Sequence, residues 1–287
     1  MDISIITVPW NVKDLVRKNF QAIFSNTKNI EFEVISVDND SKDGTTEMIQ
    51  KEFPQVKAIF NNYNAGFAKA NNQGIKISTG RYVLLLNPDM QVKPGTLETI
   101  VKWMDEHPEA GVAGCKLVKA DGTIVPHVRR YPGIWDQAAV ILKIPHFFPR
   151  VLNHYMWRDF DYSREQVVDS IRGSFFVIRR EVLDKLGGLD ERYFLWFEEV
   201  DFCKQVALAG YKVMYTPITE CVDHVGKSFA QVPTGKLQNI FQDSMTKYFQ
   251  KWQPTWQVVV LNLIWPIGKL MAFVGAKIKF KKKVGVN

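Results

Sequence analysis

The chain has 287 residues, of which 46% are hydrophobic, so it is long and apolar enough for one large α/β core and is not a disordered chain. Its net charge of +7 suits a phosphate-bearing substrate, an anionic membrane or a nucleic acid, and equally a plain solvated basic surface. Three cysteines without paired spacing, Cys115, Cys203 and Cys221, exclude a disulfide framework and a cysteine-based zinc site.

The N-terminal apolar run, Ile3 to Ile6, is too short for a signal peptide, so we expect a protein of the cytoplasm. Apolar runs then alternate with amphipathic stretches, which is typical of βαβ units that build an open, largely parallel sheet. Strands are predicted at Ile3 to Val8, Glu33 to Val37, Val56 to Phe60, Tyr82 to Leu86 and Gly111 to Leu117. Helices are predicted at Val12 to Asn26, Thr45 to Phe53, Ala65 to Thr79 and Gly95 to His107.

The periodicity weakens from Asp121 to Val168, where several prolines predict irregular structure. A strand from Ile171 to Arg179 follows. The remaining predicted elements are a helix from Glu181 to Leu186 that Gly187-Gly188 ends, a helix from about Glu199 to Gly210, and a short strand from Lys212 to Tyr215.

The last part of the chain has a different composition. Trp256 to Ala276 is almost wholly apolar, and a basic run beginning at Lys277 follows it. Its length approaches the roughly 20 residues of a spanning helix, but Asn262, Pro266 and Lys269 interrupt it. These interruptions favour an amphipathic helix at the membrane surface, with the lysines toward anionic headgroups. The alternative is a helix that packs on the protein's own core or on a second subunit, as in a homodimer.

Polar residues gather where the predicted strands end, and ligands of open α/β sheets bind at the carboxyl ends of strands. Asp89, in the turn Asn87-Pro88-Asp89, is a candidate ligand for Mg2+ or Mn2+, or a simple turn residue. Asp38 is a candidate for binding a base or ribose. The amide-rich block from Asn64 to Gly74 enters a helix, whose N-terminus favours phosphate, and it lacks the Walker pattern of an ATPase.

Two further candidates lie in the second half. Glu198 and Glu199 follow a run of aromatic residues, and apolar surroundings raise the pKa of a carboxyl toward the range of a general base. Acids are also favourable at a helix start, so a purely structural role is the alternative. His224 follows the last predicted strand and is a candidate to complete the metal shell that Asp89 begins.

Taken together, these motifs resemble the family 2 glycosyltransferases of GT-A fold, and particularly their bacterial rhamnosyltransferase-like branch. The match runs in order from Ile3 to Gly226. Its motifs are Asp38-Asn39 with Ser41, the Asn64 to Gly74 block, Asn87-Pro88-Asp89, Gly173 with Arg179-Arg180, Gly187 to Asp190, Phe197 to Asp201, and His224 with Gly226 and Ser228.

The resemblance implies a GT-A domain over residues 1–228, with a donor-binding half at about 1–118 and an acceptor and catalytic half at about 119–228. The composition of the C-terminal part, not the resemblance, predicts that residues 229–287 form a helical, membrane-associating segment. Such a protein would lie in the cytoplasm, peripheral on the inner face of the cell membrane.

The resemblance also implies roles for single residues. Glu199 stands at the position of the catalytic base, but the family usually shows Glu-Asp where this chain has Glu198-Glu199, so Glu198 remains a candidate. Asp89 would be the surviving acid of the family's DxD motif and would bind the metal, Mn2+ or Mg2+, with His224. The expected donor-binding residues are Thr7, Pro9, Asn11, Asp38, Asn64, Gly66, Phe67, Asn71, Asn72 and Asn87, and the expected acceptor-binding residues are Gly173, Ser174 and Trp196.

The implied reaction is an inverting transfer of a sugar, rhamnose from dTDP-rhamnose by likeness, to a saccharide or lipid-linked saccharide. A sugar-nucleotide synthase is disfavoured because Thr7 to Asn11 is not a glycine- and basic-rich loop. A nucleotide-sugar hydrolase and a catalytically impaired membrane-associated scaffold stay open as alternatives. Nucleic-acid binding has only Arg129-Arg130 beside Tyr131 in its favour, without a recognition motif, so we expect no nucleic-acid partner.

Overall fold

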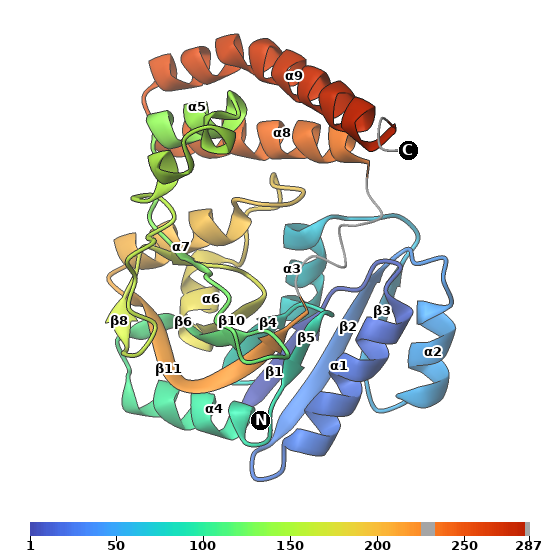
Figure 1. Cartoon of the computed structure of the whole chain (residues 1–287). Helices are drawn as coiled ribbons and strands as arrows, with labels where there is room; N and C mark the ends of the chain where they lie inside the picture. The colour runs from blue at the N-terminus through green and yellow to red at the C-terminus, as the bar shows by residue number, and fades with distance from the viewer. Residues whose placement is uncertain (225–232, 285–287) are drawn as a thin grey trace.

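The computed structural model describes residues 1–224 and 233–284, and of residues 234 and 272–284 it describes the backbone alone. A central sheet carries helices on both faces, and a group of helices lies at one end of it (Figure 1). The strand order is β3-β2-β1-β4-β10-β6-β11-β5, with β8 paired to β11. The predicted α/β class, an open sheet flanked by helices, is confirmed.

The N-terminal half is built as the sequence pattern predicts, apart from one short strand, β5 (Met90–Val92), which the pattern does not predict. Its strands are β1 (Ile3–Thr7), β2 (Phe32–Asn39), β3 (Lys57–Asn61), β4 (Tyr82–Leu86), β5 (Met90–Val92) and β6 (Ala110–Val118). Its helices are α1 (Lys13–Asn26), α2 (Thr45–Glu52), α3 (Phe67–Ile77) and α4 (Thr96–Glu106). Because β1 pairs in parallel with both β2 and β4, and β2 in parallel with β3, these strands all end at one edge of the sheet.

The second half departs from the prediction in three places. Its elements are β7 (Val128–Arg129), α5 (Ile134–Ile141), η1 (Ile144–His146), η2 (Pro149–Leu152), β8 (Gln166–Val167), β9 (Ser170–Ile171), β10 (Phe175–Arg179), α6 (Arg180–Leu186), α7 (Glu198–Leu208) and β11 (Lys212–Asp223). The stretch predicted to be irregular contains helix α5. The strand predicted from Ile171 to Arg179 is two strands, since β9 pairs with β7 outside the main sheet. The strand predicted to end at Tyr215 continues to Asp223.

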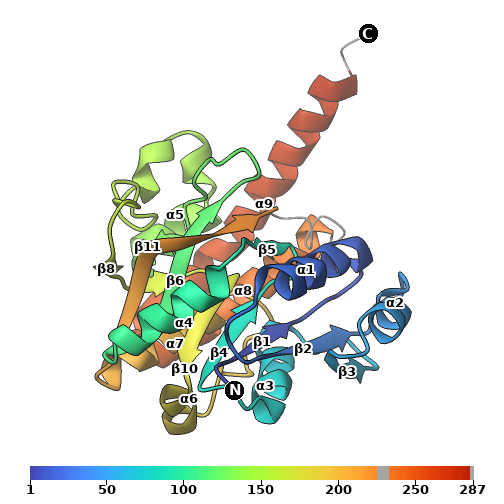
Figure 2. The same ribbon diagram turned by 90° about the horizontal axis from the view of Figure 1, so that it is seen from below.

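The sheet is mixed because β10 runs antiparallel between β4 and β6. Its two faces are covered by separate cores. Ile5 of β1 faces the core formed with α1 and α4, while the next residue, Ile6, faces the core formed with α3, α6 and α7. Side chains of a strand alternate between faces, so a strand covered on both sides is buried along its whole length, as β1 and β4 are. Figure 2 shows α1 and α4 together on one face of the sheet.

The C-terminal part forms two helices, α8 (Thr234–Trp252) and α9 (Thr255–Val284). With α5 they enclose a third core that includes Met245, Tyr248, Leu261 and Trp265. α9 therefore packs one face on the protein itself, which is the alternative that the sequence left open. No helix in the described part of the chain combines the length and apolarity that crossing a bilayer needs. The side chains of the basic run beyond Lys277 lie outside the described residues.

Candidate functional site

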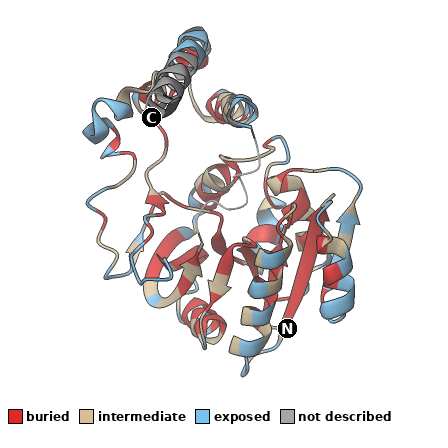
Figure 3. Ribbon diagram, turned by 45° about the vertical axis from the view of Figure 1, so that its right-hand side comes forward, coloured by how far each residue is buried: buried red, intermediate tan, exposed pale blue. Residues whose placement is uncertain are grey.

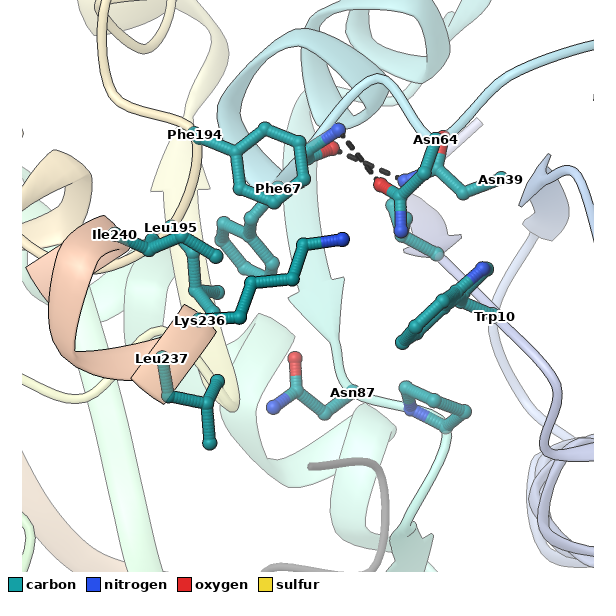
Figure 4. Close-up of a pocket in the computed structure, with 13 residues that line it drawn as sticks. Trp10, Asn39, Asn64, Phe67, Asn87, Phe194, Leu195, Lys236, Leu237 and Ile240 are labelled. Carbon is teal, nitrogen blue, oxygen red and sulfur yellow. Dashed lines mark hydrogen bonds between the residues drawn. The ribbon is translucent and has the colours of Figure 1, made fainter. Parts of the chain in front are cut away.

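A cavity of about 460 Å³ opens at the carboxyl edge of the sheet, between the N-terminus of α3 and the first turns of α8 (Figure 4). Four of the residues predicted to bind the donor line it: Asn64, Gly66, Phe67 and Asn87. The other lining residues are Val8, Trp10, Asn39, Pro88, Phe194, Leu195, Lys236, Leu237 and Ile240. The volume lies within the range typical of small-molecule sites.

The wall formed by the start of α3 is shaped by a close backbone approach. Gly66 has φ +83°, and a Cβ at this position would lie 2.5 Å from the carbonyl oxygen of Phe194. The amide of Phe67 donates a hydrogen bond to that same carbonyl at 2.7 Å. Only glycine tolerates both the backbone angle and the contact. The first turn of α3 carries no acidic residue, so its partial positive charge faces the cavity unopposed.

The predicted base-binding carboxylate, Asp38, is buried at the end of β2. Its Oδ2 accepts hydrogen bonds from the amide of Ser41 at 2.9 Å and the hydroxyl of Thr46 at 3.4 Å. Its Oδ1 is buried and has no partner within the described part of the chain, and the same is true of the Thr7 hydroxyl. A buried acceptor without a partner is costly, which favours a ligand donor at this place.

Pro9 and Asn11 shape the loop after β1. The carbonyl of Pro9 accepts from the amide of Asn39 at 3.0 Å, and Asn11 Oδ1 accepts from the amide of Lys42 at 2.6 Å. These bonds join the loops that follow β1 and β2. The two residues therefore hold the edge of the site in place, whatever contact Asn11 makes with a donor.

Asn71 and Asn72 are placed differently from the expectation. Both belong to the predicted donor-binding set, yet their amides bond to the protein itself. Asn71 Nδ2 donates to the carbonyl of Phe67 at 2.9 Å. Asn72 donates to the carbonyl of Leu189 at 2.8 Å and accepts from its amide at 2.9 Å. The Asn72 bonds join α3 to the turn at Gly188, whereas the Asn71 bond lies within α3.

The two predicted metal ligands are brought together by the pairing of β11 with β5. The amide of His224 donates to the carbonyl of Asp89 at 3.1 Å, and Asp223 pairs with Met90. Burial and the negative charge of Asp223 raise the pKa of Asp89 to about 6. His224 Nε2 is buried and has no hydrogen-bond partner in the described structure.

We tested whether these residues fit a divalent cation. Within the described ranges, no three His, Cys, Asp or Glu side chains are grouped as a cage. A cation here would instead take Asp89 and His224 and complete its shell with diphosphate oxygens, as Mg2+ sites on nucleotides commonly do. Two observations fit that arrangement. A positive ion would favour the ionised form of Asp89, whose pKa is raised, and it would give His224 Nε2 a partner.

The short segment between β9 and β10 joins the parts of the site. The Arg172 guanidinium pairs with Asp223 at 2.9 Å. A Cβ at Gly173 would lie 3.4 Å from Phe67 Cζ and 3.6 Å from Glu199 Cβ. The carbonyl of Ser174 accepts from the amide of Asn87 at 3.0 Å. The break in the predicted strand therefore lies between three parts of the site: Phe67 of the donor wall, Asp223 next to His224, and Glu199.

Glu198 and Glu199 begin α7 after two residues with left-handed backbone, Trp196 at φ 67° and Phe197 at φ 70°. Such angles cost energy in residues other than glycine and persist only where packing imposes them. The Trp196 ring packs against Phe241 of α8, with 6.0 Å between centroids. The turn therefore depends on the C-terminal helices for its shape.

The environments of the two glutamates differ. Burial raises the pKa of Glu198 well above its ordinary value, and the charge of Glu199 raises it further. Burial also raises the pKa of Glu199, but the positive charges of Arg129 and Arg172 oppose that shift. Of the two, Glu199 is the one whose ionised form is supported by neighbouring cations.

Lys236, Leu237 and Ile240 line the cavity and were missed from the sequence. Lys236 lies in the first turn of α8, which carries no acidic residue, and Figure 4 shows its ammonium group extended into the cavity. The sequence holds one usable signal, because residues 224–242 contain Lys227 and Lys236 but no Asp or Glu. Of the family motif after His224, Gly226 and Ser228 lie outside the described residues.

Comparisons with known proteins show the family and the fold. The sequence model described as Glycosyl transferase family 2 matches residues 4–187. An N-acetylglucosaminyl-diphospho-decaprenol L-rhamnosyltransferase of Mycobacterium tuberculosis (strain ATCC 25618 / H37Rv) is 28% identical over 217 residues, which are 71% of this chain and 70% of that protein. The rhamnosyltransferase WbbL of Escherichia coli (strain K12) is 28% identical over 152 residues, 52% of this chain and 55% of WbbL.

Solved structures share the fold at low sequence identity. The mannosyltransferase PcManGT from Pyrobaculum calidifontis, in complex with GDP-Man and Mn2+, has a TM-score of 0.58 at 19% identity, covering 99% of this chain and 76% of that one. S. aureus TarS 1-349 in complex with UDP-GlcNAc has a TM-score of 0.57 at 16% identity, covering 100% and 76%.

Proposed function

This chain belongs to glycosyl transferase family 2, and we propose that it moves a sugar from a nucleoside diphosphate in the cavity to an acceptor hydroxyl beside Glu199. The observation that carries the proposal is the position of Gly173, in contact distance of both Phe67 of the donor wall and Glu199. Glu199 does not itself line the cavity. We infer that a sugar bound beside Phe67 extends past Gly173 toward the Glu199 carboxylate, as a displacement requires.

The donor is bound by three kinds of group. The buried free oxygen of Asp38 accepts from the base or ribose. The N-terminus of α3, Asn87 and Lys236 face the diphosphate, whose charge they offset. A divalent cation at Asp89 and His224 would supply further neutralisation of the diphosphate.

Glu199 is the base and Glu198 stays protonated. As the acceptor oxygen attacks the anomeric carbon, its proton passes to Glu199, and the bond from that carbon to the diphosphate oxygen breaks on the opposite side. The nucleoside diphosphate leaves with the bonding pair, and one such displacement inverts the anomeric centre. The cations that favour ionised Glu199, Arg129 and Arg172, support this division of roles.

For the sugar, dTDP-rhamnose is our first choice, because two relatives bear the name of rhamnosyltransferases. The acceptor we propose is a saccharide on a lipid diphosphate, by analogy with the mycobacterial relative. We further infer that the enzyme works in the cytoplasm on the inner face of the membrane, in the synthesis of a cell-surface glycan.

The outer face of α9 supports a membrane contact. Val259, Leu263, Ile267 and Leu270 are exposed along it at a spacing of three and four residues, which places them on one side of the helix. No acidic residue follows Asp243 in the sequence. An apolar stripe beside basic residues is the pattern of a helix that lies in the membrane surface.

Incubation with Mn2+ and a panel of nucleotide sugars tests the proposal, with a short lipid-linked saccharide as acceptor. We expect transfer from one donor, with inverted anomeric configuration of the product by NMR. Release of free sugar without transfer would indicate a hydrolase. If no donor binds or reacts, the catalytically impaired scaffold becomes the better description.

A further inference from the structure

A group of large apolar side chains is exposed between α5 and the end of η2, outside the site described above. Trp135, Phe147 and Phe148 are 78%, 72% and 69% exposed, and Val151 is exposed beside them. We call these four residues the 135–151 surface. Single exposed apolar residues are ordinary, but aromatic side chains gathered in one segment indicate a contact surface.

Cations outnumber acids around this surface, and the one acid from residue 135 to residue 158 is Asp136, beside Trp135. From residue 137 to residue 158 the sequence contains Lys143, Arg150 and Arg158, and it contains no Asp or Glu. Arg150 lies in η2 between Phe148 and Val151 and is exposed. Exposed aromatic side chains with the cation Arg150 among them match the interface of an anionic bilayer, where rings enter the headgroup region and cations meet lipid phosphates.

The 135–151 surface lies beside α9. A Cβ at Gly268 of α9 would stand 2.5 Å from the carbonyl oxygen of Ile141, so the two backbones touch where α5 ends. Ile267 and Leu270, which flank this contact on α9, are exposed. Figure 1 shows α5 and α9 together at the end of the molecule away from the sheet, and residues 146–151, which follow α5, are all exposed (Figure 3).

We propose that the 135–151 surface is a second bilayer-binding element, which lies on anionic lipid together with the outer face of α9. The inference rests on the proposed function in one respect, since a lipid-linked acceptor is what makes the contact useful. It assigns membrane binding to a segment of the acceptor half of the chain and not to the C-terminal helix alone.

The chain that follows the 135–151 surface comes close to Glu199, the proposed base. Tyr155 follows it, and the carbonyl of Tyr155 accepts from the amide of Arg130 at 3.0 Å. Tyr155 is buried, and its hydroxyl lies close enough to Arg129 and Glu199 for both to act on its pKa, which burial raises. The 135–151 surface is therefore connected through Tyr155 to the Glu199 side of the site.

The test compares F147S/F148S and W135S with L208S, a matched control whose leucine is 70% exposed at the far end of α7. Sedimentation with vesicles of phosphatidylglycerol and phosphatidylcholine is measured for each full-length protein. We expect the wild type and L208S to bind, and F147S/F148S to bind at least about tenfold more weakly. W135S should lose less, and vesicles of phosphatidylcholine alone should bind all proteins poorly.

Two outcomes overturn the proposal. One is unchanged vesicle binding by both variants. The other is a wild-type dimer that F147S/F148S converts to monomer by light scattering with vesicle binding intact, since the surface then joins two copies of the chain. Transfer to a water-soluble acceptor without vesicles should be equal in all four proteins. Its absence in the wild type would count against the proposed function and leave the vesicle result standing by itself.

Discussion

The backbone amide of His224 donates a hydrogen bond to the carbonyl oxygen of Asp89 at 3.1 Å. The bond continues the antiparallel pairing of β11 with β5 and brings two polar side chains from distant parts of the chain to one edge of the sheet. The relationship is set by backbone pairing, so side-chain substitutions at either position should leave it intact. The side chains of Asp89 and His224 can therefore be replaced, to test whether they bind a cation, without disturbing the fold.

The first prediction concerns the cation. D89N and H224A should each weaken Mn2+ binding in the presence of UDP or dTDP by at least about tenfold, because each removes one of two protein ligands. Calorimetry with Mn2+ as titrant measures this. D161N, at an exposed carboxyl, is the control and should bind Mn2+ as the wild type does. Equal Mn2+ affinity in all four proteins would remove Asp89 and His224 from the metal site.

The second prediction separates the two glutamates. E199Q should lower kcat by roughly 10²- to 10⁴-fold, the usual contribution of a general base, and leave donor affinity almost unchanged. E198Q should retain much more activity, since a protonated carboxyl and an amide are similar in shape and charge. The paired kinetics decide the assignment. A larger loss of kcat in E198Q than in E199Q would reverse it.

The third prediction is a dependence of folding stability on pH. The pKa of Glu198 is raised in the folded state by burial and by Glu199, so the proton stabilises the folded form. Stability is greatest below the ordinary pKa of 4.5 and falls as pH rises through the raised value. E198Q should lose this slope and unfold at a higher temperature than the wild type at pH 8. The prediction is contradicted if the melting temperatures of the wild type and E198Q change with pH by the same amount from pH 5 to pH 8.

A related expectation holds for activity. The pKa of Glu199 is raised by burial, and a base must be ionised to accept a proton. Turnover at saturating donor should therefore increase with pH until Glu199 is ionised. A pH profile of kcat that is flat, or that falls over this range, would argue against a buried carboxylate as the base.

The fourth prediction uses the close contact at Gly66. G66A adds a methyl group against the Phe194 carbonyl at a positive φ, so both strain and collision act there. G122A also places an alanine at a positive φ, +84°, but with nothing within 4 Å of the added Cβ. G66A should lower the free energy of unfolding by about 1–3 kcal/mol more than G122A and should weaken UDP or dTDP binding. Denaturant unfolding measures the difference, and equal losses would show that the contact does not matter.

The fifth prediction concerns Lys236. K236M should weaken dTDP and UDP binding by roughly 10- to 100-fold, because an ionic hydrogen bond to the diphosphate is lost, and should bind thymidine or uridine as before. K236R should recover most of the affinity. K102M, at an exposed lysine of α4, is the control. Equal effects of K236M on nucleoside and nucleoside diphosphate would show that Lys236 contacts the base or acts only on the fold.

Much of the N-terminal half could be predicted from the sequence, because there the hydrophobic pattern of each segment matches the strand or helix that it forms. β1 and β4 are mostly apolar because they are buried on both faces, and the stretches that follow the strands carry the helical period. The break between β9 and β10 had no such signal. It follows from where Arg172 and Gly173 must lie against Asp223 and Glu199, which are partners from other parts of the chain.

The sequence by itself determined which side chains stand at the ends of strands, because periodicity and turn residues mark those ends locally. The tertiary structure decided which of them share a cavity. It turned Asn72 toward Leu189, brought Lys236 from α8 to the donor wall, and gave Glu199 cationic neighbours that Glu198 lacks. Charge and burial act through space, and distances between elements far apart in the chain are fixed only when the layers pack.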